Sequence, residues 1–224
     1  MEEAASTTAM EDRGNSYVSR GVDADFYRRA AGVQQFETVR HFAFTPDGYF
    51  MVRDNGRSNI VGESSALRQT MDDYCVGGLK YLTYSFDYPE RFYCVDSQDE
   101  PYWNFEDSAF QAAVESEYKT PVRVALGLED GWIVVFDDDS VGMGGRLPRN
   151  LYNKIRSRNR RTHVLQEVSL GPDEQWFIKW ESGRTDWCLY GAVSEAASEL
   201  ENEGRTVQNI HFGPDDAFLI RLTS

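Results

Sequence analysis

The sequence predicts a mainly β chain with short helices, organised as five units of about 42 residues that close into a ring. Two observations support this fold class: a turn motif recurs at a nearly constant interval, and the last repeat is divided between the two ends of the chain. We expect residues 15–224 to form one domain. Residues 1–14 are polar and acidic and contain no apolar run, which is typical of a disordered tail.

The recurring motif places a turn-forming pair, Pro-Asp or Asp-Gly, between an apolar residue and an aromatic residue. It reads Phe-Thr-Pro-Asp-Gly-Tyr-Phe at 44–50 and returns in altered form at 86–92, 128–133, 170–177 and 212–218. Pro presets φ, and Asp or Gly tolerates the other turn dihedrals, so each copy predicts a turn between two strands. Self-similarity of this period is typical of solenoids, propellers and arrays.

Each unit predicts the same order of elements. An apolar strand precedes the turn, as at 164–170, and a second apolar strand follows it, as at 132–136. An acidic loop leads to a weaker third strand, as at 187–190, and a helix with an amphipathic pattern completes the unit, as at 147–155. We therefore expect three strands and a helix in every unit.

The fifth unit stops after its second strand, at 217–222. At the other end of the chain, residues 17–21 are typical of a third strand and residues 23–30 of a capped helix. An open solenoid needs polar caps and has no use for complementary half-units. A ring closed by pairing the terminal strands needs both, and it hides the strand edges that favour aggregation.

The Phe-x-Pro-Asp-Gly-aromatic turn between two strands resembles the blades of WD40-like and tachylectin-like propellers, over residues 16–223. The resemblance implies a five-bladed β-propeller in which a helix replaces the usual fourth strand of each blade. The Gly-His and Trp-Asp signatures of WD40 repeats are absent. Three strands and a helix repeated five times are also similar to the α/β propeller of the pentein superfamily, which is the alternative fold.

Composition limits the partners and the compartment. A net charge of −14 argues against binding of nucleic acid, which needs concentrated positive charge. The basic run at 156–161 fits a solvated connector, a docking site for an acidic partner or a localisation signal. Cys75, Cys94 and Cys188 are odd in number and lack short spacings, as expected of buried thiols in a reducing compartment. Without a membrane span or a signal peptide in the sequence, we expect a cytoplasmic or nuclear protein.

The loops between second and third strands are the first candidate site. They differ from unit to unit on a repeated framework, which favours one composite surface over five equal pockets. Their carboxylates lack the Asp-x-Asp-x-Asp-Gly spacing of a calcium site, so we expect no metal and no cofactor. With three tryptophans as candidate rim anchors, the candidate binding residues are Asp96, Asp99, Trp103, Trp132, Asp137, Asp138, Asp139, Arg184 and Trp187.

Five aromatic residues occupy the same place in the repeat, at the opening of the second strand: Tyr49, Phe92, Trp132, Trp176 and Phe218. We expect these side chains to act as wedges between neighbouring units.

Two histidines are the candidate residues of a central channel. His41 and His211 lie on the first strands of the first and fifth units, which a closed ring makes neighbours. Aligning Phe44 with Phe212 shows that the two histidines occupy different positions of the repeat. A polar pair near the axis would bind a metal or transfer protons, but no third ligand is evident from the sequence.

These features predict a non-enzymatic binding module without catalytic residues. Its acidic loops would meet a protein partner with a basic surface. A carbohydrate-binding lectin of the tachylectin-like type, with a glycan as its partner, is the alternative. An enzyme that uses the histidine pair in the channel is a third hypothesis.

Overall fold

The computed structural model describes residues 17–20, 39–53, 55–75, 77–85, 87–160 and 162–222. The tail expected at 1–14 and the helix expected at 23–30 lie outside these residues.

The described residues form five antiparallel sheets of three strands, and the second strand of each unit is the central strand of its sheet. The strands, unit by unit, are β2 (Val39–Thr45), β3 (Gly48–Arg53) and β4 (Ser58–Val61); β5 (Leu79–Tyr84), β6 (Phe92–Asp96) and β7 (Pro101–Trp103); β8 (Pro121–Leu126), β9 (Trp132–Phe136) and β10 (Val141–Gly144); β11 (Leu165–Leu170), β12 (Trp176–Trp180) and β13 (Thr185–Cys188); and β14 (Val207–Phe212), β15 (Phe218–Leu222) and β1 (Tyr17–Arg20).

The two ends of the chain share one sheet. β1 pairs antiparallel with β15, so that Val18 lies opposite Ile220 and Arg20 opposite Phe218. β15 pairs on its other side with β14, which gives the order β14-β15-β1. This confirms the prediction that the start of the chain supplies the third strand of the fifth unit.

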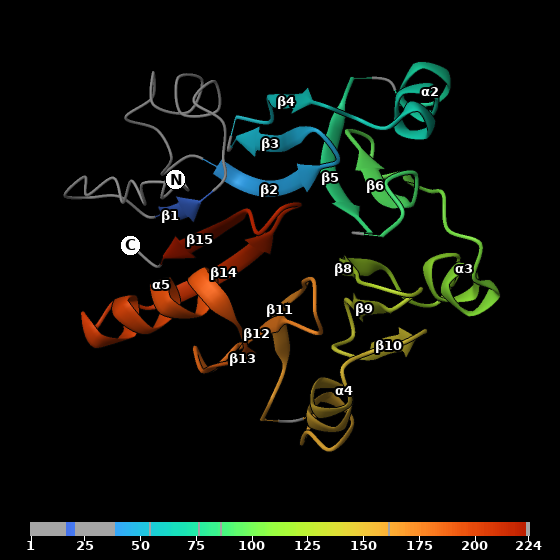
Figure 1. Ribbon diagram of the computed structural model, residues 1–224. Helices are drawn as coiled ribbons and strands as arrows, with labels where there is room; N and C mark the ends of the chain where they lie inside the picture. The colour runs from blue at the N-terminus through green and yellow to red at the C-terminus, as the bar shows by residue number, and fades with distance from the viewer. Residues whose placement is uncertain are drawn as a thin grey trace, which may run out of the picture.

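The first strands of the units contact one another in a closed sequence: β2 with β5, β5 with β8, β8 with β11, β11 with β14, and β14 with β2. We call these five the inner strands. The sheets are arranged around a common centre, and α2, α3 and α4 lie at the periphery (Figure 1). The architecture is mainly β and is consistent with a five-bladed propeller.

Within the described residues, helices follow the third strands of four units: α2 (Ser65–Asp73), α3 (Ser108–Val114), α4 (Arg149–Arg156) and α5 (Gly191–Asn202). Side-chain caps begin the first two, because Ser64 accepts the Leu67 N–H and Asp107 accepts the Phe110 N–H. None of these helices is long and apolar enough to cross a membrane.

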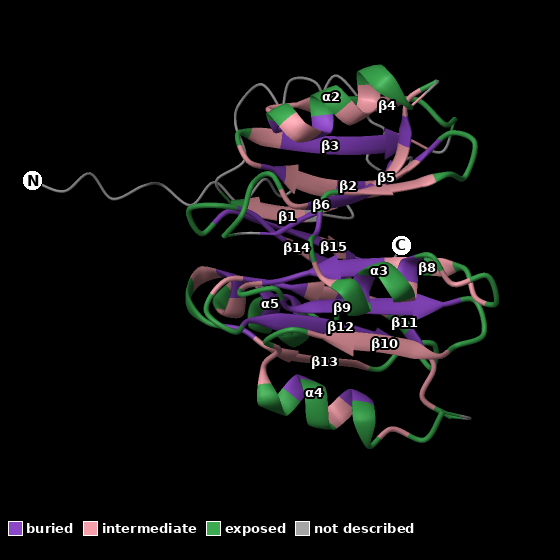
Figure 2. Ribbon diagram, turned by 90° about the vertical axis from the view of Figure 1, so that its right-hand side faces the viewer, coloured by how far each residue is buried: buried purple, intermediate pink, exposed green. Residues whose placement is uncertain are grey.

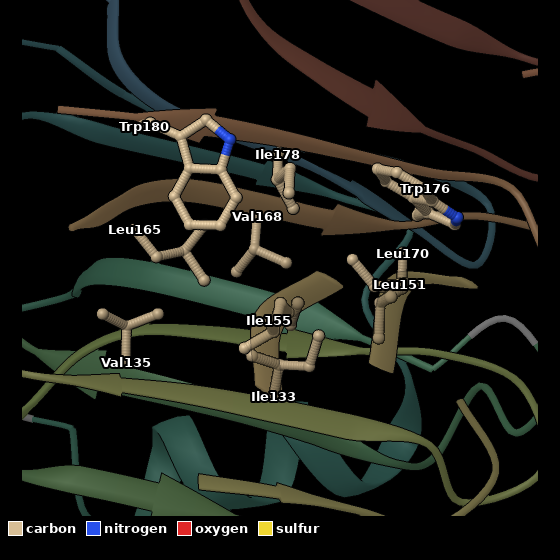
Figure 3. Close-up of a cluster of buried hydrophobic side chains, with 11 residues drawn as sticks. Ile133, Val135, Leu151, Ile155, Leu165, Val168, Leu170, Trp176, Ile178 and Trp180 are labelled. Carbon is tan, nitrogen blue, oxygen red and sulfur yellow. The ribbon is translucent and has the colours of Figure 1, made fainter. Parts of the chain in front are cut away.

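Each helix packs its apolar face between two neighbouring sheets. Leu151 and Ile155 of α4 are fully buried in one cluster with Ile133 of β9 and Ile178 of β12 (Figure 3). Burying such aliphatic side chains contributes about 1.5–3 kcal/mol each. The helices therefore help to hold successive sheets together.

The aromatic residues that open the second strands are buried. Tyr49, Phe92, Trp132, Trp176 and Phe218 expose at most 5% of their surface, and they belong to five separate clusters. Burial is concentrated in the strands, whereas loops and outer helical surfaces are exposed (Figure 2). Each cluster combines residues of two neighbouring units, as expected of wedges between units.

The hairpins define two opposite faces of the ring, because consecutive strands are antiparallel. The turns between first and second strands, at 46–47, 128–131, 172–175 and 214–217, form what we call the turn face. The loops between second and third strands, at 55–57, 97–100, 137–140 and 181–184, form the loop face.

Acidic residues on the turn face hold an unusual backbone conformation. Asp215 and Asp216 have φ of 51° and 58°, and the Ala217 N–H donates to the Pro214 carbonyl at 2.9 Å. Two central residues with positive φ define a type I′ turn, which favours Asn-Gly. The same conformation recurs at Glu129-Asp130 and Asp173-Glu174.

Candidate functional site

A cavity of about 850 Å³ lies at the centre of the ring and is lined by all five inner strands. At the loop face its lining includes Arg40, Lys80 and Val122, near the starts of inner strands. At the turn face it includes Pro46 and Pro214. Its volume falls within the range of small-molecule sites.

Every inner strand carries a β-bulge at the same place. In β2 the pairing register shifts between Val39 and His41, which leaves Arg40 as the extra residue. The same shift occurs in the other inner strands. The residues that follow the bulge, which we call the post-bulge residues, are His41, Tyr81, Arg123, Glu167 and Asn209. All five line the cavity.

The post-bulge position does not repeat, although the strand around it does. Its five residues all differ in chemical type, with one positive and one negative charge among them, whereas the next position is apolar in every unit: Phe42, Leu82, Val124, Val168 and Ile210. Bulges are frequent next to functional sites, where they re-aim a side chain. The centre of the ring is therefore asymmetric in chemistry on a repeated backbone.

Post-bulge side chains bond the next inner strand. His41 Nε2 lies 2.9 Å from the Leu82 carbonyl oxygen. The Tyr81 hydroxyl donates to the Val124 carbonyl at 2.6 Å and accepts the Val124 N–H at 3.1 Å. These bonds fix the side chains along the cavity wall and link adjacent sheets.

An ion pair continues this network around the ring. Arg123 Nε lies 3.3 Å from Glu167 Oε2. Asn209 Nδ2 donates to the same carboxylate at 3.4 Å, and Ser169 donates to Asn209 Oδ1 at 2.8 Å. Glu167 thus joins three successive units.

Both histidines line the cavity, as the channel hypothesis requires. The His41 ring stacks on Tyr81 at a centroid separation of 4.3 Å, and the His211 ring meets Phe42 edge-on at 5.4 Å. Among the residues that the structure describes, His211 Nε2 is buried without a hydrogen-bond partner.

Burial keeps the two imidazoles neutral. It lowers the pKa of His41 to about 4, and the positive charges of Arg123, Arg221 and Arg40 act in the same direction. Burial also lowers the pKa of His211 well below its ordinary value, with Arg221 contributing. Groups with such pKa values are poor acids and weak bases near neutral pH.

The described residues contain no group of three or more His, Cys, Asp or Glu side chains placed to hold a metal ion. The histidine pair therefore has no third protein ligand in the part of the chain that the structure describes.

Positive side chains gather where the cavity opens at the loop face. We call Arg40, Lys80, Arg123 and Arg221 the cationic end of the cavity, since all four line it. The Nη1 atom of Arg221 donates to the Arg40 carbonyl at 3.2 Å. Arg123 is paired with Glu167, and Lys80 is paired with Asp99.

Lys179 lies close to this group on β12, opposite Glu167 in the sheet. It is buried, with 7% of its surface exposed, and its ammonium contacts the side-chain oxygen of Gln208. Burial lowers the pKa of Lys179, and the charge of Arg221 contributes to this lowering while that of Glu167 opposes it.

The loops of the loop face share one backbone turn despite their different sequences. The residue three positions after the end of each second strand has positive φ, and these residues are Gly56, Asp99, Asp139 and Gly183. In each loop the N–H of this residue donates to the carbonyl three positions earlier, as from Asp139 to Phe136 at 3.0 Å. The loops are therefore alike in path and different in the side chains they display.

The candidate carboxylates of these loops fall into two groups. Asp99, Asp137, Asp138 and Asp139 are exposed. Asp96 exposes only 2% of its surface, because its carboxylate accepts the N–H groups of Gln98 and Glu100 at 2.8 and 2.9 Å. Asp residues commonly bond their own backbone two positions on, so Asp96 organises its loop and is not displayed.

Asp138 and Arg184 have partners within the molecule. Asp138 accepts the Ser140 N–H at 3.0 Å and pairs with Lys119 at 3.0 Å. The hydrogen bonds from Ser140 and Lys119 lower its pKa to about 2. Arg184 pairs with Asp186 at 3.0 Å.

The three candidate tryptophans are not equivalent. Trp132 is 3% exposed and packs with Phe110 of α3, so its ring is in the interior and not on the rim. Trp103 and Trp187 are half-buried, and Trp187 stacks on Phe177 at 6.2 Å. The most exposed aromatic residues are tyrosines, among them Tyr118 and Tyr74 at 91% and 61%.

The cysteines are free thiols. Cys94 is buried, whereas Cys75 and Cys188 are only half-buried, so the expectation of buried thiols holds for one of three. Cys75, at the end of α2, packs against the cluster that contains Cys94. The structure thus brings together two cysteines that have no short spacing in the sequence.

Sequence reasoning missed all four residues of the cationic end. A signal was present, because Lys179 and Arg221 occupy the position where the first three units have Val52, Val95 and Val135. Where a charged residue replaces the valine of the other units, the requirements of the repeated fold alone do not explain the residue.

No family model and no curated protein matches this chain. The inferences below therefore rest on the sequence and on the geometry of the site.

Proposed function

We propose that the protein is a non-enzymatic binding module of the five-bladed propeller type, which holds a protein partner on its loop face. The observation that carries this proposal is that one turn geometry recurs in the loops while the displayed side chains differ. A rigid scaffold with variable loops is suited to recognition. One composite surface binds one partner, whereas a lectin of the tachylectin-like type would repeat its pocket.

Charge complementarity is the proposed mechanism. Asp99, Asp137 and Asp139 are exposed on this face, and the protein carries a net charge of −14. Such a field attracts a partner with a basic surface and accelerates its approach at low salt. Half-buried Trp103 and Trp187 pair with Tyr93 and Phe177 at the turn-face ends of their strands, so they are not part of the proposed contact on the loop face.

The histidines give less support to an enzyme. Their imidazoles are neutral, and the His41 Nε2 is already engaged with Leu82. General acid or base catalysis favours a pKa near the operating pH.

A pull-down with matched variants tests the proposal. D137N/D139N removes two charges from the loop face. The amide oxygen that replaces the carboxylate oxygen at position 137 can still accept the Thr120 N–H, and asparagine tolerates the positive φ at position 139. D215N/D216N removes two charges from the turn face, where both residues also have positive φ, and serves as the control.

For a partner captured by the wild-type protein, we expect D137N/D139N to weaken binding roughly 2- to 30-fold, mainly through a slower association rate. D215N/D216N should bind as the wild type does. Equal loss in both variants, or no loss in either, would contradict the loop-face proposal. Release of the partner by free sugars would favour the lectin instead.

A further inference from the structure

We propose that the cationic end of the central cavity binds a small organic anion through its carboxylate or phosphate group. This site adjoins the exposed carboxylates of the loop face, since Asp99 pairs with Lys80 and lines the same cavity, but its test does not require a protein partner. The inference rests on three independent features of the cavity: its charge, its departure from the repeat, and its shape.

The charge of the cationic end opposes that of the whole protein. Within a chain of net charge −14, Arg40, Lys80, Arg123 and Arg221 line one end of the same cavity. Lys80 and Arg123 each have a carboxylate partner, whereas Arg40 and Arg221 form no ion pair in the described residues. Like charges brought together in a cavity repel each other, and a bound anion would remove this repulsion.

The guanidinium groups suit oxyanions in particular. Arginine presents planar, forked donors that match the oxygens of carboxylate and phosphate in pairs. Arg221 is held in place by its bond to the Arg40 carbonyl, which brings residues of the first and fifth units together. Buried Lys179, on β12 of the adjacent sheet, adds a positive charge that interacts with that of Arg221.

The framework does not require these cations. The position of Lys179 and Arg221 is filled by valine in the first three units, and the sheets form there without a charge. Lys179 contacts Gln208 and lies outside the cavity lining. Arg221 lines the cavity, so its replacement of the valine is the departure from the repeat that points to a negatively charged ligand.

The other residues that line the cavity indicate the chemical character of the remainder of the ligand. The stacked rings of His41 and Tyr81 form part of its wall, and His211 lines it nearer the turn face. Asp47, Glu63 and Glu90 line the opposite end, where they would repel an anion and orient it toward the arginines. A ligand of metabolite size, with one anionic end and a polar body, fits these groups.

Thermal unfolding at constant ionic strength tests the site with two chemically defined ligands, inorganic phosphate and citrate. Sodium chloride replaces each ligand in the reference, because salt alone screens the repulsion in an acidic protein. Isothermal titration calorimetry gives the dissociation constants. The variants are R40Q and R221Q, and the control is R149Q, which removes an exposed charge at the start of α4.

We expect at least one of the two anions to raise the melting temperature of the wild type above the chloride reference. Loss of one arginine should weaken binding about tenfold. At a ligand concentration ten times the wild-type dissociation constant, the stabilisation in R40Q or R221Q should fall to roughly 30% of the wild-type value. R149Q should respond as the wild type does.

Circular dichroism establishes that each variant is folded, and R40Q tests the site even where R221Q in β15 fails to fold. Phosphate binding without citrate binding would identify a phosphate group as the recognised end, and the reverse a carboxylate. Absence of stabilisation by either anion, or the same response in R40Q and R149Q, would overturn the proposal.

Discussion

Closure of the ring can be tested at the contact between Gly213 and Phe44, which belong to the last and first units. Gly213 follows β14, and a Cβ placed on it would lie 2.7 Å from the Cγ and Cδ1 atoms of the Phe44 ring. Carbon atoms essentially never approach so closely without displacement. The substitution Gly213→Ala therefore forces the ring of Phe44 or the backbone to move.

The size of the effect follows from two opposing contributions. Adding a methyl group to a packed contact costs typically 1–3 kcal/mol. The backbone of Gly213 does not have positive φ, so alanine fits its conformation and recovers about 0.4–1 kcal/mol by restricting the unfolded chain. We expect a net loss of about 1–2 kcal/mol, which lowers the melting temperature by roughly 2–8 °C in a protein of this size.

A double-mutant cycle measured by urea unfolding assigns the loss to this contact. Phe44→Leu provides space, so Gly213→Ala should cost less in the Phe44→Leu background, with a coupling of about 1 kcal/mol. Gly127→Ala is the control, because its Cβ would meet the flexible Leu170 side chain at 3.0 Å. Strictly additive effects of Gly213→Ala and Phe44→Leu would refute the contact, and with it closure between the last and first units.

Three further predictions concern local strain and titration. Replacing Asp215-Asp216 by Asn-Gly should stabilise the protein by about 1 kcal/mol in urea unfolding, because both residues have positive φ; unchanged stability would contradict the strain. Burial raises the pKa of Cys94, so iodoacetamide at pH 8 should leave Cys94 unmodified in the folded protein and alkylate it in urea, as read by mass spectrometry; rapid modification of the folded protein would contradict this. Burial lowers the pKa of His41 in the folded protein to about 4, below its ordinary value of 6.5. The stability present above pH 6.5 should therefore fall by up to about 3 kcal/mol as the pH decreases to 4. His41→Gln should lessen this fall, and a pH profile identical to that of the wild type would show that His41 does not contribute.

Local chemistry explains why the fold could be predicted. Pro, Asp and Gly restrict or relax the backbone at their own positions, so the copies at 44–50 and 212–218 predict their turns without knowledge of the rest of the chain. The divided unit added one long-range constraint, and pairing of β1 with β15 satisfies it. Both signals survive in a single sequence because they repeat.

The candidate site was harder to predict because its residues are defined by neighbours across the ring. Arg40 and Arg221 come from opposite ends of the chain and meet through one hydrogen bond. Asp96 and Asp99 belong to one loop, yet only the path of the backbone decides that the first is buried and the second exposed. Composition marked the loop as acidic and did not distinguish these roles.

The post-bulge position explains how a repeated fold can have a centre without symmetry. The backbone hydrogen bonds of each sheet and the apolar residues beside the bulge are the parts that recur in every unit. The post-bulge side chain contacts mainly the next inner strand. A substitution there alters the contacts with the adjacent units, which are two in the case of Glu167. The chemistry of the axis is therefore set unit by unit, so that an imidazole, a phenol, a guanidinium, a carboxylate and an amide stand side by side around one cavity. A ligand bound there would contact each unit differently and would have one preferred orientation.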